Sequence, residues 1–342
     1  MKIVVVDPPH DKGGVQSMKY RTVGKTGIQV SELCFGTMSF GGNADKDTSK
    51  QLFYRCLEKG INFFDTADVY SRGVSEEILG ELIEGKRDEL VLTSKAGFPS
   101  GSDPNARGAS RRHLFLSVEQ SLKRLRTDRL DFYFIHRFDS LTAIEETLRA
   151  LDDLQRQGKI LYPAVSNWAA WQIAKALGIS AKESLASFEL IQPMYNLVKR
   201  QAEVELLPLA ESEKLGVISY SPLGGGLLTG KYGVGKKPAA GRLVEQSNYT
   251  KRYNDEAYYA IADRFADYAY EKGIHPATLA VAWVLHHPAV TSPIIGARNL
   301  EQLEPSLAAV DLDFTNEWRK EITALSIDPP LATDRSEEVG GR

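Results

Sequence analysis

The sequence has few cysteines, no long apolar run and no recognisable signal peptide. Only two of the 342 residues are cysteines, Cys34 and Cys56, which is too few for a disulfide framework and favours reduced structural thiols over a redox pair. No apolar run approaches the roughly 20 residues of a membrane-spanning helix. The opening MKIVVVDPPH is too short for a signal peptide. We therefore expect a soluble, cytoplasmic protein.

The chain also lacks a strong excess of either charge. It has 42 Lys and Arg residues against 45 Asp and Glu, a net charge of −3. This balance gives no general attraction to nucleic acid or to an anionic membrane, so we expect neither as a partner, and any phosphate recognition must be local. Hydrophobic residues make up 42% of the chain, enough to fill one large core.

Eight apolar runs alternate with helix-like segments. The expected strands are ELCFG, NFFD, LVLTSK, DFYFIH, YPAVS, FELIQ, GVISY and SPIIG. Helices are expected over residues 47–59, 75–83, 110–125, 143–157, 254–271 and 276–286. This alternation predicts a closed (β/α)8 TIM barrel of the α/β class rather than an open sheet, with the hairpin YRTVGKTGIQVS covering its floor.

The barrel should form a single domain over residues 18–325. We expect residues 1–17 to be a leader outside the fold and residues 326–342 to be a loose polar tail, because proline and glycine interrupt both segments. Residues 222–254, after the seventh strand, form a long loop with glycines and basic residues. A loop of that length in a compact domain is usually functional.

Three of the strands end on ionisable residues. FFDTADVY reaches Asp65 and presents Tyr70 five residues later, LVLTSK ends on Lys95, and DFYFIH ends on His136. Side chains alternate between the two faces of a strand, so these groups should share a face with Ile61, Phe63, Val91, Thr93, Phe132 and Phe134. If those faces point into one barrel, the acid, the ammonium and the imidazole converge on a site.

Such a group suits proton transfer. Tyrosine, with a pKa near 10, is a poor acid at neutral pH, but the ammonium of Lys95 should lower the pKa of Tyr70 by stabilising phenolate. Asp65 would keep that lysine charged and aimed, and His136 could hydrogen-bond a carbonyl oxygen or the tyrosine hydroxyl. The alternative is structural: Asp65 and Lys95 form a buried ion pair, and His136 is a satisfied core residue.

Two further groups occupy later strand ends. Ser166, Asn167 and Gln192 could hold a flat carboxamide, and Tyr220 could stack on an aromatic ring, although strand-end Ser and Gln commonly cap helices. SPLGGGLLTGKY has the G-x-x-x-x-G-K spacing of a P-loop but places Tyr232 where Ser or Thr should bind Mg²⁺. Its backbone amides could still follow a pyrophosphate.

The final strand leads into a helix through PIIGARNLEQLEPS. A helix N-terminus after the last barrel strand is a natural anion site, and Arg298 adds a bidentate donor, unless it is simply a solvated arginine. We expect no metal ion in the protein.

These motifs resemble those of aldo-keto reductases. The resemblance extends from Met18 to about Leu312, and it is greatest to the branch of bacterial reductases and potassium-channel β-subunits. It rests on GTMSFGG, FFDTADVY with SEEILGELI, LVLTSK, RLRTDRLDFYFIHRFD, SNW, IQPMYN, SPLGGGLLTGKY and IIGARNLEQLE. It implies a TIM barrel that binds NADPH without a Rossmann fold, consistent with the absence of a strand-linked G-x-G-x-x-G.

The resemblance also assigns roles by position. Tyr70 would be the general acid, Lys95 and Asp65 the pair that tunes it, and His136 the group that orients the substrate. The implied cofactor-binding residues are Gly36, Thr37, Met38, Asp65, Ser166, Asn167, Gln192, Tyr220, Ser221, Pro222, Leu223, Gly225, Leu227, Lys231, Arg242, Gly296, Arg298, Gln302 and Ser306.

Three positions depart from the family pattern. Pro305 and Ser306 stand where relatives often have Glu-Asn against adenine, and Met38 stands where many have tryptophan, which would make the substrate pocket more pliable.

The sequence thus predicts an NADPH-dependent reductase of aldehydes or ketones. One alternative is a non-catalytic NADP-sensing subunit, and another is a Schiff-base aldolase that uses Lys95. The expected partner is a small carbonyl compound. Its identity and the oligomeric state do not follow from the sequence.

Overall fold

The computed structural model describes residues 18–333. The expected leader, residues 1–17, and the end of the expected tail, residues 334–342, lie outside the described residues. The first part of that tail contacts the barrel, because Arg200 donates a hydrogen bond to Asp328 at 2.9 Å. Among the described residues, no helix is both long and apolar enough to cross a membrane.

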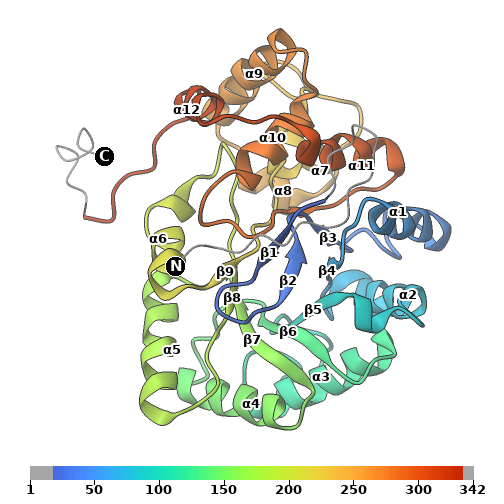
Figure 1. Cartoon of the computed structure of the whole chain (residues 1–342), viewed down its shortest axis with the longest axis vertical. Helices are drawn as coiled ribbons and strands as arrows, with labels where there is room; N and C mark the ends of the chain where they lie inside the picture. Colours follow the sequence, from blue (N-terminus) through green and yellow to red (C-terminus); the bar gives the residue numbers. More distant parts are fainter. Residues whose placement is uncertain (1–17, 334–342) are drawn as a thin grey trace.

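Eight parallel strands form the predicted barrel (Figure 1). Their order is β10-β3-β4-β5-β6-β7-β8-β9. The backbone amide of Ile294 in β10 donates to the carbonyl of Ser219, just past β9, at 2.8 Å, so the two ends of the sheet meet. The strands are β3 (Cys34–Gly36), β4 (Phe63–Asp65), β5 (Val91–Ala96), β6 (Leu130–Ile135), β7 (Ile160–Ser166), β8 (Leu190–Gln192), β9 (Gly216–Val217) and β10 (Ile294–Ile295).

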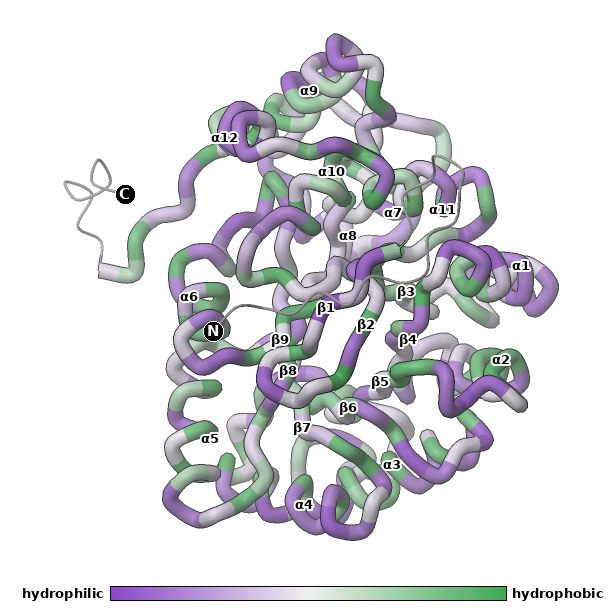
Figure 2. Tube along the Cα trace, in the orientation of Figure 1, coloured by the Kyte–Doolittle hydropathy of each residue, from purple (hydrophilic) through white to green (hydrophobic). Residues whose placement is uncertain are grey.

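Helices surround the strands. They are α1 (Lys46–Glu58), α2 (Val74–Leu82), α3 (Arg111–Leu125), α4 (Ile144–Arg156), α5 (Ala170–Glu183), α6 (Leu206–Glu213), α7 (Arg242–Glu245), α8 (Ser247–Arg252), α9 (Glu256–Glu271), α10 (Pro276–Leu285), α11 (Leu300–Leu307) and α12 (Asn316–Ala324). Figure 2 shows hydrophilic and hydrophobic residues alternating along the outer helices, as expected of helices with one face on a core. The seventh loop contains α7 and α8, which the sequence did not predict.

The predicted strand faces are confirmed inside the barrel. An inner cluster includes Phe63, Val91, Phe132 and Phe134, whereas the side chains facing the helices form a separate core. Ile61 is the exception. It precedes β4 and packs in the outer core, because the strand alternation begins only at Phe63.

The N-terminal hairpin covers the barrel floor as predicted. Its strands are β1 (Tyr20–Thr22) and β2 (Gln29–Ser31), and Val23 and Val30 belong to the inner cluster. Gly24 has a φ of 50°, and a Cβ there would lie 2.6 Å from the carbonyl oxygen of Lys214, so the close approach requires glycine.

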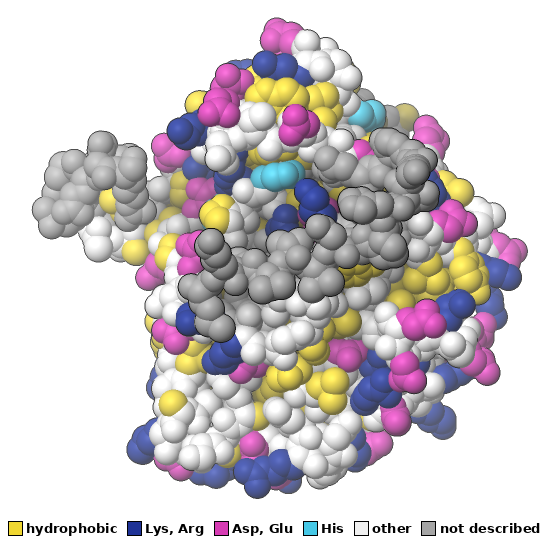
Figure 3. Space-filling model, in the orientation of Figure 1, with side chains coloured by type: hydrophobic (Ala, Val, Ile, Leu, Met, Phe, Trp, Pro, Cys, Tyr) yellow, Lys and Arg dark blue, Asp and Glu magenta, His cyan; other side chains and the backbone are white. Residues whose placement is uncertain are grey.

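Cys34 and Cys56 are buried, free thiols. On the face seen in Figure 3, positive and negative side chains lie interspersed along the lower edge of the molecule, in keeping with the balanced composition.

Candidate active site

A cavity of about 800 Å³ lies at the carboxyl ends of the strands, where barrel enzymes place their sites. Strand ends and the seventh loop contribute most of its wall. The expected site residues that line it are Gly36, Met38, Asp65, Tyr70, His136, Ser166, Asn167, Gln192, Tyr220, Ser221, Pro222, Leu223, Gly225, Lys231, Arg242, Gly296, Arg298 and Gln302.

Three residues expected at the cofactor do not line this cavity. The hydroxyl of Thr37 lies 2.8 Å from that of Ser75 and bonds the backbone of Asp65, so it supports the wall from behind. Leu227 is fully buried in the outer core, and Ser306 is buried on α11 while its neighbour Pro305 faces the cavity. Adjacent side chains on a turn or helix point in different directions, so motif position alone does not decide which residue faces a ligand.

Lys95 and Asp65 form the buried base of the site. Strands β4 and β5 pair with Asp65 opposite Thr93, which brings Lys95 on the same face above the carboxylate. Nζ of Lys95 lies 2.6 Å from Oδ2 of Asp65 and 2.8 Å from the carbonyl oxygen of Thr66. Burial alone would lower the pKa of Lys95, but Asp65 and Tyr70 outweigh it, so the pKa is raised and the ammonium keeps its proton.

Tyr70 stands over this pair. Its hydroxyl is 3.5 Å from Nζ of Lys95, and its ring, partly exposed to the cavity, lies 5.1 Å from the ammonium. Ser71 and Arg72, which follow, have left-handed φ values of 48° and 56°, and Ser71 is anchored to the carbonyl of Phe40 at 2.7 Å. The tight turn therefore fixes where the phenol points.

The pKa of Tyr70 differs from the sequence expectation. Burial raises it to about 12, and Lys95 opposes that rise without reversing it, because the carboxylate of Asp65 also raises the phenol pKa. Lys95 does lower the pKa of Tyr70 as expected, but the expected net lowering is wrong. Tyr70 is protonated at neutral pH.

His136 provides a neutral imidazole. Burial, then the charges of Lys95 and Arg137, hold its pKa well below the usual value. Its ring lies edge-on to Tyr70 at 6.0 Å and to Phe98 at 4.6 Å between centroids. Nδ1 is buried and has no hydrogen-bond partner within residues 18–333. It is therefore not the satisfied core histidine of the structural alternative.

The amide group lies on neighbouring strand ends and is connected to the catalytic group. Nε2 of Gln192 donates to Oδ1 of Asp65 at 2.9 Å, and Nδ2 of Asn167 donates to the carbonyl of His136 at 2.9 Å. The hydroxyl of Tyr220 donates to Oδ1 of Asn167 at 2.8 Å, and Ser166 donates to the carbonyl of Gln192. Polar side chains from three strands thus form one hydrogen-bonded wall.

Beyond this wall the glycine-rich segment bends sharply. Ser221, Gly224, Gly225 and Gly226 all have positive φ, from 58° to 100°. A Cβ on Gly225 would lie 3.0 Å from the ring of Tyr249, so glycine is needed where the seventh loop folds over this segment.

Cations gather further along the cavity. Burial lowers the pKa of Lys231, and the charges of Arg298 and Arg242 lower it further, with Glu245 opposing them. Arg298 pairs with Glu245 at 3.1 Å. Three cationic side chains that line one cavity favour a bound polyanion.

Sequence reasoning missed several residues of the lining. These include Ser39, Val69, Phe98, Tyr249, Arg252 and His275. Tyr249 and Arg252 belong to the long seventh loop, whose length indicated a functional role, but no motif singled them out.

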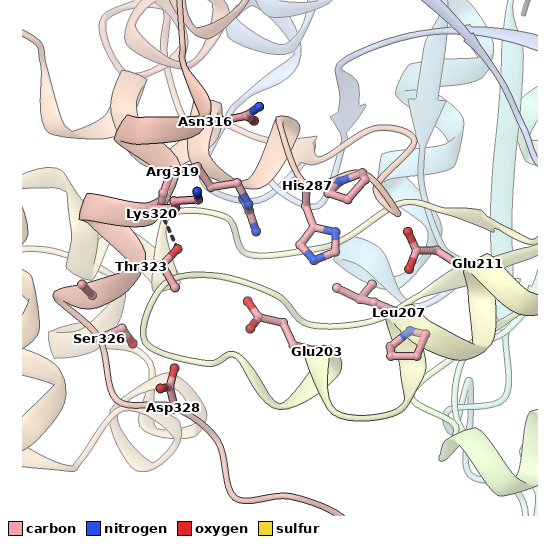
Figure 4. Close-up of a pocket in the computed structure, with 13 residues that line it drawn as sticks. Glu203, Leu207, Glu211, His287, Asn316, Arg319, Lys320, Thr323, Ser326 and Asp328 are labelled. Atoms are coloured by element: carbon pink, nitrogen blue, oxygen red, sulfur yellow. Dashed lines mark hydrogen bonds between the residues drawn. The ribbon is translucent and has the colours of Figure 1, made fainter. Parts of the chain in front are cut away.

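A second cavity, of about 1010 Å³, lies between α6 and α12 (Figure 4). Two of its three acids, Glu203 and Asp328, are paired with Arg200. His287 accepts a hydrogen bond from the backbone of Ala289, and burial lowers its pKa to about 4. These groups satisfy one another and form no catalytic arrangement. Among the described residues, no cluster of His, Cys, Asp and Glu could hold a metal ion.

The fold and the cavity together define a barrel enzyme with a proton donor, a buried ammonium and a polar wall at its carboxyl-terminal face. Residues 32–327 match the sequence model of the Aldo/keto reductase family, and the chain belongs to that family. Members of this family generally bind nicotinamide cofactors, and the chain is thereby placed among the oxidoreductases.

Three relatives show the range of the family near this chain. It is 38% identical over 312 residues to "Uncharacterized oxidoreductase YrpG" of Bacillus subtilis, covering 88% of this chain and 93% of that protein. It is 37% identical to "Probable voltage-gated potassium channel subunit beta" of Arabidopsis thaliana, covering 86% and 92%. It is 33% identical to "Norsolorinic acid reductase stcV" of Emericella nidulans, covering 86% and 78%.

Proposed function

We propose that the protein is an NADPH-dependent reductase of the cytoplasm that converts small aldehydes or ketones to alcohols, with Tyr70 as general acid. One observation carries the proposal: the protonated hydroxyl of Tyr70 faces the cavity 3.5 Å from the ammonium of Lys95. The neutral ring of His136 lies beside it. This arrangement suits protonation of a carbonyl oxygen.

The hydrogen-bond donors and cations that line the cavity suit nicotinamide adenine dinucleotide phosphate, NADPH. Ser166, Asn167 and Gln192 would hold the carboxamide, and Tyr220 would stack on the ring. Backbone amides of residues 221–225 would follow the pyrophosphate. The cations beyond them would meet the phosphate that distinguishes NADPH from NADH. When bound, the cofactor supplies the hydride that reduces the carbonyl carbon.

The chain's own residues would handle the oxygen and its proton. His136, neutral at physiological pH, donates a hydrogen bond that orients and polarises the carbonyl oxygen. Tyr70 keeps its proton until negative charge develops on that oxygen, and then transfers it. Lys95, held charged by Asp65, stabilises the phenolate that forms.

Turnover by Tyr70→Phe tests the proposal. NADPH oxidation is followed across aldehydes, ketosteroids, sugars and dicarbonyls for the wild type, Tyr70→Phe and the control Tyr54→Phe, which changes an exposed tyrosine on α1. Loss of the general acid should lower kcat about 10²- to 10⁴-fold, with NADPH affinity by fluorescence unchanged. Near-wild-type turnover by folded Tyr70→Phe would exclude Tyr70 as the acid.

A cofactor-sensing subunit is the second candidate, favoured by the similarity to the protein named as a probable channel β-subunit. It predicts NADPH binding without reduction of any carbonyl in the panel. A Schiff-base aldolase is disfavoured because the raised pKa of Lys95 leaves little free amine. Borohydride trapping of a substrate on Lys95, detected by mass spectrometry, would reverse that preference.

A further inference from the structure

A buried serine lies behind the catalytic group. Ser75, in the first turn of α2, is fully buried, and its hydroxyl donates to the carbonyl oxygen of Thr37 at 2.8 Å. The same hydroxyl oxygen lies 2.8 Å from the hydroxyl of Thr37 and 3.1 Å from that of Thr66. A serine hydroxyl has one proton and two lone pairs, so these three contacts use its whole hydrogen-bonding capacity.

Ser75, Thr37 and Thr66, which we call the Ser75 hub, contact the residues that hold Lys95. The ammonium of Lys95 donates to the carbonyl oxygen of Thr66 at 2.8 Å and to Oδ2 of Asp65 at 2.6 Å. The backbone amide of Thr37 donates to the carbonyl of Asp65 at 2.9 Å. The Ser75 hub therefore fixes the backbone of both residues that bind the ammonium.

The Ser75 hub also holds the turn that carries Tyr70. A single residue separates Ser75 from that turn, Tyr70–Gly73. The residue after Ser75 is Glu76, which is fully buried as well and accepts a hydrogen bond from the hydroxyl of Ser94 on β5 at 2.5 Å. The start of α2 is thus tied to three neighbouring strand ends or strands, and the turn cannot shift without breaking these contacts.

Resting on the proposed reductase function, we infer that Ser75 is a positioning residue whose hydroxyl sets the distance between the general acid Tyr70 and the ammonium of Lys95. That distance is 3.5 Å from Oη to Nζ, at the outer limit of a hydrogen bond, so a small displacement breaks the contact. No residue of the Ser75 hub lines the cavity, so Ser75 acts through Tyr70 and Lys95. A misplacement of about 1 Å caused by a change away from the chemistry can cost about 10²-fold in rate.

The first test is a double-mutant cycle. Values of kcat and KM for the best substrate of the carbonyl panel, and NADPH affinity by fluorescence, are measured for the wild type, Ser75→Ala, Tyr70→Phe and the double variant. Ser292→Ala is the matched control, because Ser292 is also fully buried and donates to a backbone carbonyl, that of Ser31, at the barrel floor. Thr66→Val removes one hydroxyl of the Ser75 hub while keeping the side-chain shape, and it serves if Ser75→Ala does not fold.

Ser75→Ala should lower kcat about 10- to 100-fold and leave KM and NADPH affinity unchanged, whereas Ser292→Ala keeps all three. Thr66→Val should lower kcat to a smaller extent. In the Tyr70→Phe background Ser75→Ala should cause no further loss, because the acid through which it acts is already absent. An unchanged kcat in folded Ser75→Ala, or in Thr66→Val if Ser75→Ala does not fold, would overturn the inference. So would an equal loss in both backgrounds, which would show a general effect on the barrel.

A second measurement needs no turnover. In the protein with tyrosine isotope-labelled at Cζ, the NMR resonance of Tyr70 is assigned by its absence in Tyr70→Phe. This resonance should shift in Ser75→Ala and stay in place in Ser292→Ala. If the wild type reduces no carbonyl of the panel but the resonance shifts, the positioning by Ser75 stands and the reductase is wrong. If the resonance does not move, the inference is wrong whatever the activity.

Discussion

Asp68 should hold a proton near neutral pH, and replacing it with asparagine should show this directly. It lies between Asp65 and Tyr70, is 6% exposed, and neither carboxylate oxygen has a hydrogen-bond partner among residues 18–333. Burial, then repulsion from the buried carboxylate of Glu76, raises the pKa of Asp68 from 3.8 to about 7, with Arg124 opposing the rise.

The magnitude follows from linkage. A folded-state pKa of about 7 against an ordinary value of 3.8 corresponds to about 4 kcal/mol at 1.36 kcal/mol per pKa unit. Between these values the unfolded chain has released the proton while the folded protein keeps it, so stability falls as pH rises. The full loss is reached above about pH 7. Below the unfolded-state pKa the carboxyl is neutral in both states and costs nothing.

Asp68→Asn keeps the shape and removes the titration. Relative to the wild type, its free energy of unfolding should rise between acidic and mildly alkaline pH by up to about 4 kcal/mol. Urea unfolding at several pH values measures this, with Asp313→Asn, an exposed position, as control. The asparagine amide would have few hydrogen-bond partners, which changes the free energy of unfolding by an amount that does not depend on pH. Only the change with pH in the difference between variant and wild type therefore tests the prediction. A constant difference between variant and wild type would show that Asp68 is ionised in the fold.

Three further substitutions test the ion pair and the phosphate end. Lys95→Met leaves the buried carboxylate of Asp65 without its cation and should cost about 3 to 5 kcal/mol in urea unfolding. Asp65→Asn with Lys95→Met should recover stability but not activity, and a stable single variant would contradict the pairing. Arg298→Ala should weaken NADPH about 10- to 100-fold and hardly affect NADH in fluorescence titrations. Equal losses for both cofactors would place Arg298 at the pyrophosphate or in the fold.

Much of the barrel and the centre of its site follow from short-range patterns. The period of two along a strand decides which face each side chain occupies, so Asp65 and Lys95 could be placed together from their sequence positions alone. The spacing of turns and apolar runs likewise located all eight strands. Ile61 packs in the outer core because side chains alternate between faces only inside a strand, and the sequence does not mark where β4 begins.

Long-range contacts set the limit of sequence reasoning. Tyr249 lines the cavity because α8 folds back over Gly225, and no local sequence pattern encodes that path. The pKa of Tyr70 is a sum of burial and two opposing charges, and the sequence revealed the charges but not the burial. The unpartnered carboxylate of Asp68 was missed because its surroundings come from separate helices and strands.

A single carboxylate links the two halves of the site. Asp65 accepts hydrogen bonds from Lys95 and Thr93, both at 2.6 Å, and from Gln192 at 2.9 Å. These donors come from β5 and β8, so Asp65 on β4 connects the proton-transfer group with the proposed carboxamide wall. The negative charge of Asp65 holds Lys95, which supports Tyr70 as the proposed general acid. The same charge fixes the amide of Gln192. Displacement of either group would therefore disturb both hydride and proton transfer, which the proposed reaction requires to occur at one carbonyl.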